Sequence, residues 1–360
     1  MAERCVVVLL GMHRSGTSLA ASVLQSAGVD FGDDFVPANE HNPQGYFEDV
    51  AINRVHIRVN RLLNRRPLTA AGLADYPASF RKSRQAKDCI DELEMLVRKR
   101  LEHTDQVWGF KDPHTINFLP LWDELFRRIG ARPVYVLAIR HPSAVAASTV
   151  KRDGISAGHG ELLWIDQNIA ALRHTAYRIP VIVDYDGWFA APLVQAQRML
   201  AALGLEPDVP GLEALLQDII NPGLNHQPVA GEMRLPFAGE LYRQLIQVID
   251  GADLEESTRP MVDRYRQAKD LFAPALELLE CEHRLRHSKE HELELLQLDM
   301  QQQVNGLTRR LNLLAELAST FLASRTGRLV YRYQLTKRQL TRRDKEGAAL
   351  LQLKKLLDSH

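Results

Sequence analysis

The feature that most constrains the fold is a series of short, almost continuous apolar runs. They are Cys5–Leu10, Val107–Phe110, Val134–Ile139 and Val181–Val183. Strands that are buried on both faces of a parallel sheet have this near-continuous apolar character, whereas strands with one solvent-facing side alternate. We therefore expect these runs to be strands of one parallel sheet.

Amphipathic stretches with helical periodicity separate the apolar runs. They are Ser18–Ala27, Ser83–Leu101, Leu162–Tyr177 and Leu193–Leu203. Gly28 and Gly204 follow two of them, at the position where glycine commonly ends a helix. Alternating strands and helices predict an α/β domain, a parallel sheet flanked by helices, which we expect to cover residues 1–272.

Composition excludes several classes of protein. The 360 residues include 45 Lys or Arg and 45 Asp or Glu, so the formal net charge is zero, which argues against nucleic acid as a partner. Three cysteines (Cys5, Cys89 and Cys281) are far apart and form no CxxC motif, which argues against a disulfide framework or a structural zinc site. The first apolar run is too short for a signal peptide or a membrane span, so we expect a cytoplasmic protein.

The C-terminal part of the chain has a different pattern. Apolar residues recur there mostly at steps of three or four, at Leu293, Leu296, Met300, Val304, Leu307, Leu311, Leu314 and Phe321. One apolar stripe on a long helix with a Gln-rich centre is typical of a coiled coil. We expect a long helix or coiled coil over 273–324 and a homo-oligomer formed through it.

The last segment, residues 325–360, is predicted to be a basic helical tail. Residues 325–345 contain eight Lys or Arg and one Asp, so the rest of the chain is net acidic by the same amount. Three interpretations stay open: a solvated helix that dimerises the protein, peripheral contact with the anionic inner face of a membrane, or binding of nucleic acid by this segment.

A glycine-containing loop links the first strand to the first helix. It reads Gly11-Met12-His13-Arg14-Ser15-Gly16-Thr17-Ser18-Leu19. Such a loop presents backbone N–H groups and the positive end of a helix dipole to an anion. The spacing is similar to the P-loop of nucleotide hydrolases, but Thr17 stands at the lysine position and the cation is Arg14. ATP chemistry needs that lysine and a Mg²⁺ ion, so the loop predicts anion binding of another kind.

A second anion site is predicted where the third apolar run ends. Arg140 follows that strand, and ligands of open α/β sheets bind at the carboxyl ends of strands. We expect a helix to begin near Ser143 as N-cap and to carry Ser148 two turns later. The arginine fork suits bidentate hydrogen bonds to phosphate.

These two segments resemble sulfotransferases that use 3′-phosphoadenosine 5′-phosphosulfate (PAPS), with bacterial carbohydrate-type members as the nearest likeness. The family's loop has Lys or Arg at the Arg14 position, followed by Ser-Gly-Thr-Ser/Thr. Its 3′-phosphate site is Arg and Ser with seven residues between them, the spacing of Arg140 and Ser148. The resemblance covers roughly residues 4–225 and implies a P-loop-like α/β fold, PAPS as co-substrate and no metal. It implies 5′-phosphosulfate binding by Gly11, His13, Arg14, Ser15, Gly16, Thr17 and Ser18.

Two further segments supply candidates for the reaction centre. Lys111, in Lys111-Asp112-Pro113, resembles the family's lysine that assists at the sulfuryl group together with the loop cation Arg14. Glu48, in a segment that resembles Asn-Pro-Lys-Gly-Tyr-Phe-Glu, is our candidate base, because apolar neighbours raise a carboxyl pKa toward neutrality.

Several alternatives stay open at the reaction centre. Lys111 could be a strand-end lysine paired with Asp112, and Glu48 could cap or ion-pair at a helix start. Rival bases are Asp33, Asp34, Glu40, Asp49, His13 and His41. Asp184-Tyr185-Asp186 resembles the family's Tyr-Glu-Asp with its order shifted, and we expect it to have a core and turn role.

The resemblance implies transfer of the sulfuryl group to a hydroxyl of a carbohydrate or glycolipid. Acceptor pockets of the family lie on variable loops, which correspond to residues 50–105 and 152–165. Two other functions stay open: a divergent P-loop kinase of small molecules, and an inactive sulfotransferase-like scaffold that acts through its coiled coil.

Overall fold

The computed structural model describes residues 4–37, 45–63, 80, 82–105, 107–205, 209–220, 233–271, 273–325, 328–339, 341, 345 and 347. The chain forms two compact units, Met1–Cys281 and Glu282–His360, each of which is described by itself. The sequence-based boundaries after residues 272 and 324 stay predictions.

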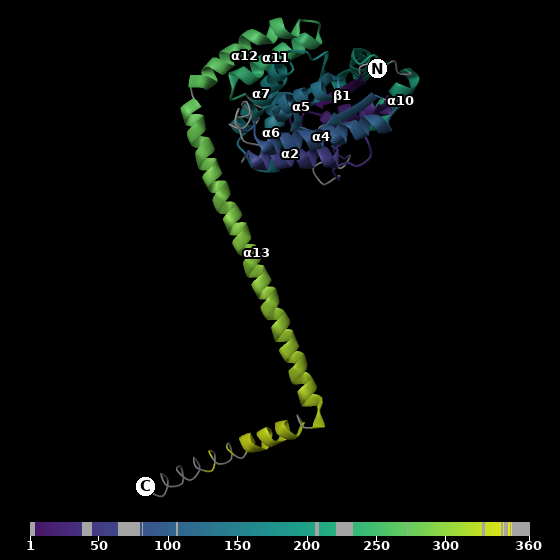
Figure 1. Cartoon of the computed structure of the whole chain (residues 1–360). Helices are drawn as coiled ribbons and strands as arrows, with labels where there is room; N and C mark the ends of the chain where they lie inside the picture. The colour runs from purple at the N-terminus through teal and green to yellow at the C-terminus, as the bar shows by residue number, and fades with distance from the viewer. Residues whose placement is uncertain are drawn as a thin grey trace. The chain divides into compact units, whose positions relative to one another are not determined.

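A five-stranded, fully parallel sheet forms the centre of the first unit (Figure 1). The strands are β1 (Arg4–Leu10), β2 (Val29–Asp30), β3 (Val107–Lys111), β4 (Ala131–Ile139) and β5 (Val181–Asp184). Their order across the sheet is β2-β3-β1-β4-β5. The predicted α/β class and all four predicted strands are confirmed, whereas β2, with two residues at the sheet edge, is too short for any periodicity to reveal.

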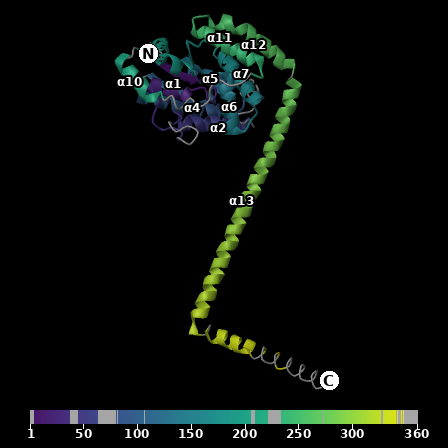
Figure 2. The same ribbon diagram turned by 180° about the vertical axis from the view of Figure 1, so that it is seen from behind.

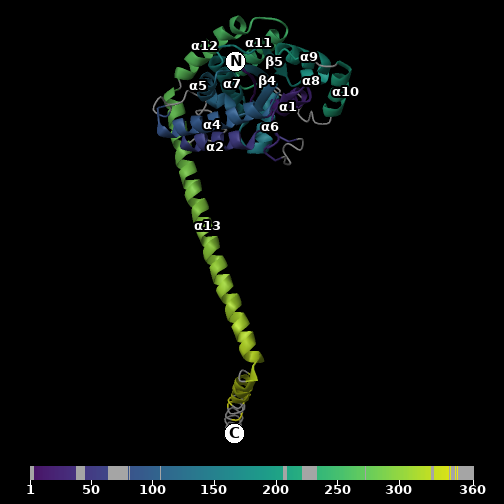
Figure 3. The same ribbon diagram turned by 45° about the vertical axis from the view of Figure 1, so that its right-hand side comes forward.

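Helices cover both faces of the sheet, which explains why its strands are continuously apolar. In β1, Val6 and Val8 pack into one buried cluster, and Val7 and Leu9 pack into the other. The first cluster is completed by α2 (Val50–Leu62), α4 (Arg84–His103), α5 (Thr115–Ile129), α7 (Ala157–His174), α11 (Pro236–Ile249) and α12 (Leu254–Leu271). The second is completed by α1 (Thr17–Ser26), α8 (Gly187–Ala190), α9 (Pro192–Ala202) and α10 (Val209–Ile219), which lie together in Figure 3.

The helix starts show where capping side chains decide a boundary. Helix α7 begins five residues before the predicted Leu162, because the Ser156 side chain accepts a hydrogen bond from His159 N at 3.2 Å. The predicted N-cap of α6 (Pro142–Asp153), Ser143, is wrong. His141 takes that position, its Nδ1 accepting from Ser143 N at 3.3 Å, because Pro142 with its fixed φ already occupies the first helical turn.

The second unit contains most of α13 (Ala273–Ala323), one continuous helix of 51 residues (Figure 2). Residues 328–339 are helical as well. The predicted long helix is therefore present, and its pairing in a coiled coil stays a prediction. None of the helices in the described part of the chain is both long and apolar enough to cross a membrane.

Candidate functional site

Four neighbouring strands direct the predicted site segments to one edge of the sheet. Because β3, β1, β4 and β5 are adjacent and parallel, their carboxyl ends meet there. The segments that follow these strands are Gly11–Ser18, Asp112–His114, Arg140–Ser148 and Tyr185–Asp186. The topology therefore brings together residues that are far apart in the sequence.

The loop after β1 folds tightly back on itself. Ser15 N donates to Met12 O at 3.1 Å, and Arg14 and Gly16 have positive φ angles of 71° and 82°. A Cβ atom on Gly11 would lie 2.6 Å from Thr17 Cγ2 and 2.7 Å from Ala138 O, so only glycine fits there. Helix α1 then begins at Thr17, and among the described residues no side chain caps its N-terminus. The arrangement leaves the positive end of α1 for an anion.

Arg14 connects this loop to the second predicted anion site. Its Nε donates to Ser148 Oγ at 2.9 Å, so the two sites are contiguous. Burial lowers the pKa of Arg14, and the nearby guanidinium groups of Arg152 and Arg140 lower it further. Crowded cations of this kind are relieved by a bound anion. Arg152, from the last turn of α6, is close enough to affect Arg14, and its guanidinium donates to both carboxylate oxygens of Asp153 at 2.7 Å.

Arg140 contacts two aromatic residues, one through its side chain and one through its backbone. Its guanidinium carbon lies 4.1 Å from the centroid of the Tyr185 ring, and its backbone oxygen accepts from Trp164 Nε1 at 3.0 Å. The Tyr185 ring also lies against the loop, since a Cβ on Gly16 would be 2.5 Å from Tyr185 Cδ2. The core and turn role expected for this segment was therefore too narrow, because Tyr185 contacts both predicted anion sites.

Lys111 and Glu48 form a buried ion pair beside the loop. Lys111 Nζ donates to Glu48 Oε1 at 2.7 Å and to Tyr46 O at 2.9 Å. Burial raises the pKa of Glu48 above its ordinary value; Lys111 opposes this rise, and Asp112 adds to it. The partner of Lys111 is thus Glu48, and the predicted alternative, an ion pair with Asp112, is wrong.

The rival carboxylates have other surroundings. Asp49 caps α2, accepting from Ala51 N at 2.8 Å and Ile52 N at 3.2 Å. It also accepts from Arg100 Nε at 2.9 Å, so its lone pairs are largely used. Asp33 and Asp34 are exposed to solvent. Glu40 and His41 lie outside the described residues.

Two histidines lie close together near Lys111. The rings of His13 and His114 are 5.4 Å apart between centroids, in an edge-to-face arrangement. Burial lowers the pKa of both rings, and the positive charge of Lys111 adds to this effect. His13 is therefore neutral near pH 7 and able to accept a hydrogen bond or a proton. His114 belongs to none of the sequence motifs described above.

Asp112 is the centre of a buried hydrogen-bond network that the sequence analysis also missed. Trp122 Nε1 donates to His56 Nε2 at 3.0 Å, so the proton of His56 is on Nδ1, which donates to Asp112 Oδ2 at 3.0 Å. Asn53 Nδ2 and His114 N donate to the same carboxylate at 3.1 and 2.8 Å. Burial alone would raise the pKa of Asp112, but His56, His114 and these hydrogen bonds hold it well below its usual range. Because these partners are up to 59 residues from Asp112 in the sequence, no local sequence pattern predicts the network.

The residues at this edge fit the donor that the sequence motifs imply. Ser15 Oγ is buried and has no hydrogen-bond partner among the described residues, as expected of a group that binds a ligand in the loop. Glycine occupies the two loop positions where a Cβ would clash. Among the described side chains, no group of three or more His, Cys, Asp or Glu is arranged around a common metal position.

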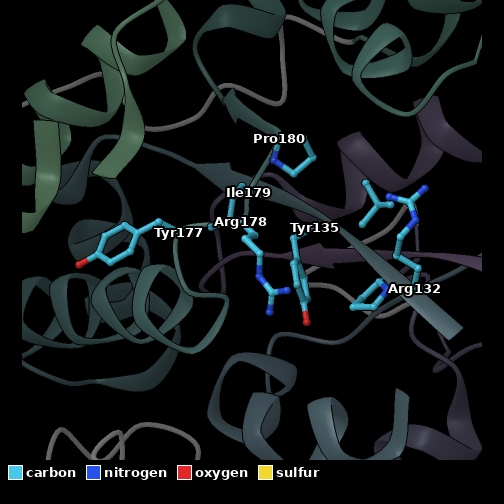
Figure 4. Close-up of a pocket in the computed structure, with 8 residues that line it drawn as sticks. Arg132, Tyr135, Tyr177, Arg178, Ile179 and Pro180 are labelled. Atoms are coloured by element: carbon cyan, nitrogen blue, oxygen red, sulfur yellow. The ribbon is translucent and has the colours of Figure 1, made fainter. Parts of the chain in front are cut away.

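A cavity of about 440 Å³ lies at the opposite, amino-terminal edge of β4 and β5 (Figure 4). Its lining comes from residues 132–135 and 177–180. It contains none of the predicted site residues.

Comparison with known proteins gives structural matches only. No family model matches the chain, and no curated protein matches it. The sulfotransferase domain from the Synechococcus PCC 7002 olefin synthase is similar with a TM-score of 0.40 and 17% identity, over 73% of this chain and 95% of that chain. The sulfotransferase domain from the curacin biosynthetic pathway has a TM-score of 0.38 and 16% identity, over 58% of this chain and 76% of that chain.

Proposed function

We propose that this chain is a sulfotransferase that moves the sulfuryl group of PAPS to a hydroxyl of a carbohydrate or glycolipid. The supporting observation is the contact between Arg14 Nε and Ser148 Oγ at 2.9 Å, which joins two anion-binding segments at one edge of the sheet. PAPS carries anionic groups at two separate positions of its ribose, so a donor of this kind needs two adjoining anion sites. A P-loop kinase would need a lysine in this loop, and the chain has Thr17 at that position.

The two segments divide the donor between them. The loop residues Gly11–Ser18 and the N-terminus of α1 would hold the 5′-phosphosulfate, with Arg14 as the cation. Arg140 and Ser148 would hold the 3′-phosphate, and Tyr185 keeps the Arg140 guanidinium in place. When bound, the donor supplies an activated sulfuryl group whose leaving group is a phosphate oxygen.

The reaction requires a base and cations for the leaving group. The acceptor oxygen forms a bond to sulfur while the bond from sulfur to the phosphate oxygen breaks, and the bonding electrons pass to that oxygen. Arg14 and Lys111 stabilise the developing negative charge. Glu48, which the buried Lys111 holds at 2.7 Å, takes the proton of the acceptor hydroxyl.

The experiment that tests this proposal is transfer of ³⁵S from labelled PAPS into a panel of sugars and glycolipids. We expect Glu48→Gln to lower transfer by about 10²- to 10⁴-fold, because a positioned base contributes this much. Asp34→Asn, which changes an exposed carboxylate, is the matched control and should transfer normally. Full activity of Glu48→Gln would move the base to another group, and Mg²⁺-dependent phosphate transfer from ATP would replace the proposal with the kinase.

We also propose that the basic segment contacts an anionic membrane surface. Leu329 and Tyr333 are 70% and 66% exposed on the 328–339 helix, alongside Arg328 and Arg332. Sedimentation with phosphatidylserine vesicles should fall in Arg328→Gln/Arg332→Gln, since each cation near the surface adds about 1 kcal/mol. Equal sedimentation of the variant and the wild type would contradict this role.

A further inference from the structure

Helix α13 carries an apolar stripe that is left exposed among the described residues of its unit. Seven side chains of the stripe are 52–66% exposed: Leu293, Leu296, Met300, Val304, Leu307, Leu311 and Leu314. The helices of the first unit, by contrast, bury their apolar faces against the sheet. A contiguous exposed apolar stripe on a helix marks an interaction surface for another helix.

Six of the seven stripe residues are placed symmetrically about a point between positions 303 and 304. The symmetric pairs are Leu293 with Leu314, Leu296 with Leu311, and Met300 with Leu307. The seventh residue, Val304, has Gln303 as its counterpart. A two-fold axis at this point would place the three apolar pairs opposite one another in an antiparallel second copy.

The charges beside the stripe fit the same arrangement. At about 100° per residue, Asp299 and Arg310 lie on the same flank of the stripe. In an antiparallel pair centred between positions 303 and 304, Asp299 lies within about one helical turn of Arg310 of the partner subunit. The two-fold axis repeats this ion pair. Within its own helix, Asp299 accepts a hydrogen bond from Gln303 Nε2 at 3.0 Å.

The charge along α13 also favours antiparallel over parallel pairing. Residues 277–299 contain seven acidic residues and three Lys or Arg, whereas residues 309–323 contain one acidic residue and two Lys or Arg. A parallel pair would put the two acidic halves side by side, and an antiparallel pair brings each acidic half against the other, weakly basic half.

We propose that α13 pairs with α13 of a second copy of this chain as an antiparallel coiled coil centred between Gln303 and Val304. The proposal stands on the stripe and its charges and does not depend on the sulfotransferase assignment. It differs from a general expectation of oligomers in fixing the partner, the direction and the register.

Sedimentation equilibrium of the full-length chain tests the pairing. We expect a dimer, and we expect Leu307→Asp to raise its dissociation constant more than about tenfold, because the variant buries a charge in the stripe. Leu298→Asp is the matched control, since Leu298 is 60% exposed on the same helix but lies on the opposite side from the stripe. A monomeric wild type, or equal effects of the two variants, would overturn the proposal.

Exchange of the paired charges tests the direction. Asp299→Arg and Arg310→Asp should each weaken the dimer by about two- to fivefold per ion pair, and the double variant should restore the wild-type dissociation constant. Additive weakening in the double variant would exclude the antiparallel register. Circular dichroism of each variant separates this result from loss of helix.

Discussion

At the scale of single residues, two buried carboxylates of the candidate site, Asp112 and Glu48, have different surroundings. Hydrogen bonds from His56, Asn53 and the backbone N–H of His114 keep Asp112 ionised. Glu48 has a pKa raised by burial and has Lys111 as its ionic partner. Two titratable groups whose environments separate their pKa values are a common basis for acid and base roles.

Replacing Asp112 should therefore change the pH dependence of the reaction. The negative charge of Asp112 raises the pKa of Glu48, so Asp112→Asn lowers that pKa. Because the base must be ionised, the acidic limb of the kcat/KM profile should move to lower pH. The control is Asp123→Asn on α5, which changes a half-buried carboxylate paired with Arg127 and should leave the limb in place. An unchanged or upward-shifted limb in Asp112→Asn would contradict the coupling between these carboxylates.

Asp184 gives a prediction about stability. Burial, and then Asp186, raise the pKa of Asp184 to about 6, although Tyr242 Oη donates to it at 3.1 Å. The folded state thus binds a proton that the unfolded state has lost between about pH 4 and 6, so stability falls as the pH rises through this range. Urea unfolding should show a loss of about 1–3 kcal/mol from this group, absent in Asp184→Asn. A parallel pH dependence in the two proteins would contradict the raised pKa.

At the scale of elements, the strands were predictable because burial on both faces leaves a continuous apolar run. The two-residue strand β2 carries no such pattern. Helix α2 was not among the predicted helices, although Ile52, Val55 and Val59 recur at helical spacing, because β-branched residues favour strands as well.

The candidate site was also predictable only in part: residues of short motifs were predicted, and residues that meet through packing were not. The loop Gly11–Ser18 is one short motif, and Arg140 with Ser148 is another. The residues of each motif lie within a few positions of one another, so each motif can be recognised from the sequence. The contacts of His56, Trp122 and Tyr185 depend on the packing of separate elements, so no local signal identifies them.

The loop before α1 offers a test of how tightly these elements are packed. Gly16→Ala places a Cβ 2.5 Å from the Tyr185 ring at a φ of 82°, so we expect it to lower donor affinity and stability. Gly28→Ala is the control, because Gly28 has a φ of 93° with open space around it. The control should lose only the backbone cost, about 1–2 kcal/mol in thermal or urea unfolding. Equal losses in the two variants would contradict the contact between Tyr185 and the loop.

At the scale of the whole molecule, the zero net charge is the sum of unlike parts. The segment 325–345 is strongly basic, and the remaining residues are net acidic. An anionic donor is therefore not attracted by the overall charge and must be bound by a few placed cations. In the structure, Arg14, Arg140 and Arg152 gather at the carboxyl edge of the sheet, while the basic segment lies outside the first unit.

Calorimetric titration with 3′-phosphoadenosine 5′-phosphate in the presence of EDTA tests the central claim most directly. We expect the wild type to bind this product without Mg²⁺ and Arg140→Ala to bind it about 100-fold or more weakly, because charge-assisted hydrogen bonds to the 3′-phosphate are lost. Arg132→Ala, at the opposite edge of the sheet, should bind normally. Adenosine 5′-phosphate, without the 3′-phosphate, should bind the wild type and Arg140→Ala equally weakly. Undiminished binding of the bisphosphate by Arg140→Ala, or binding only with Mg²⁺, would contradict the account.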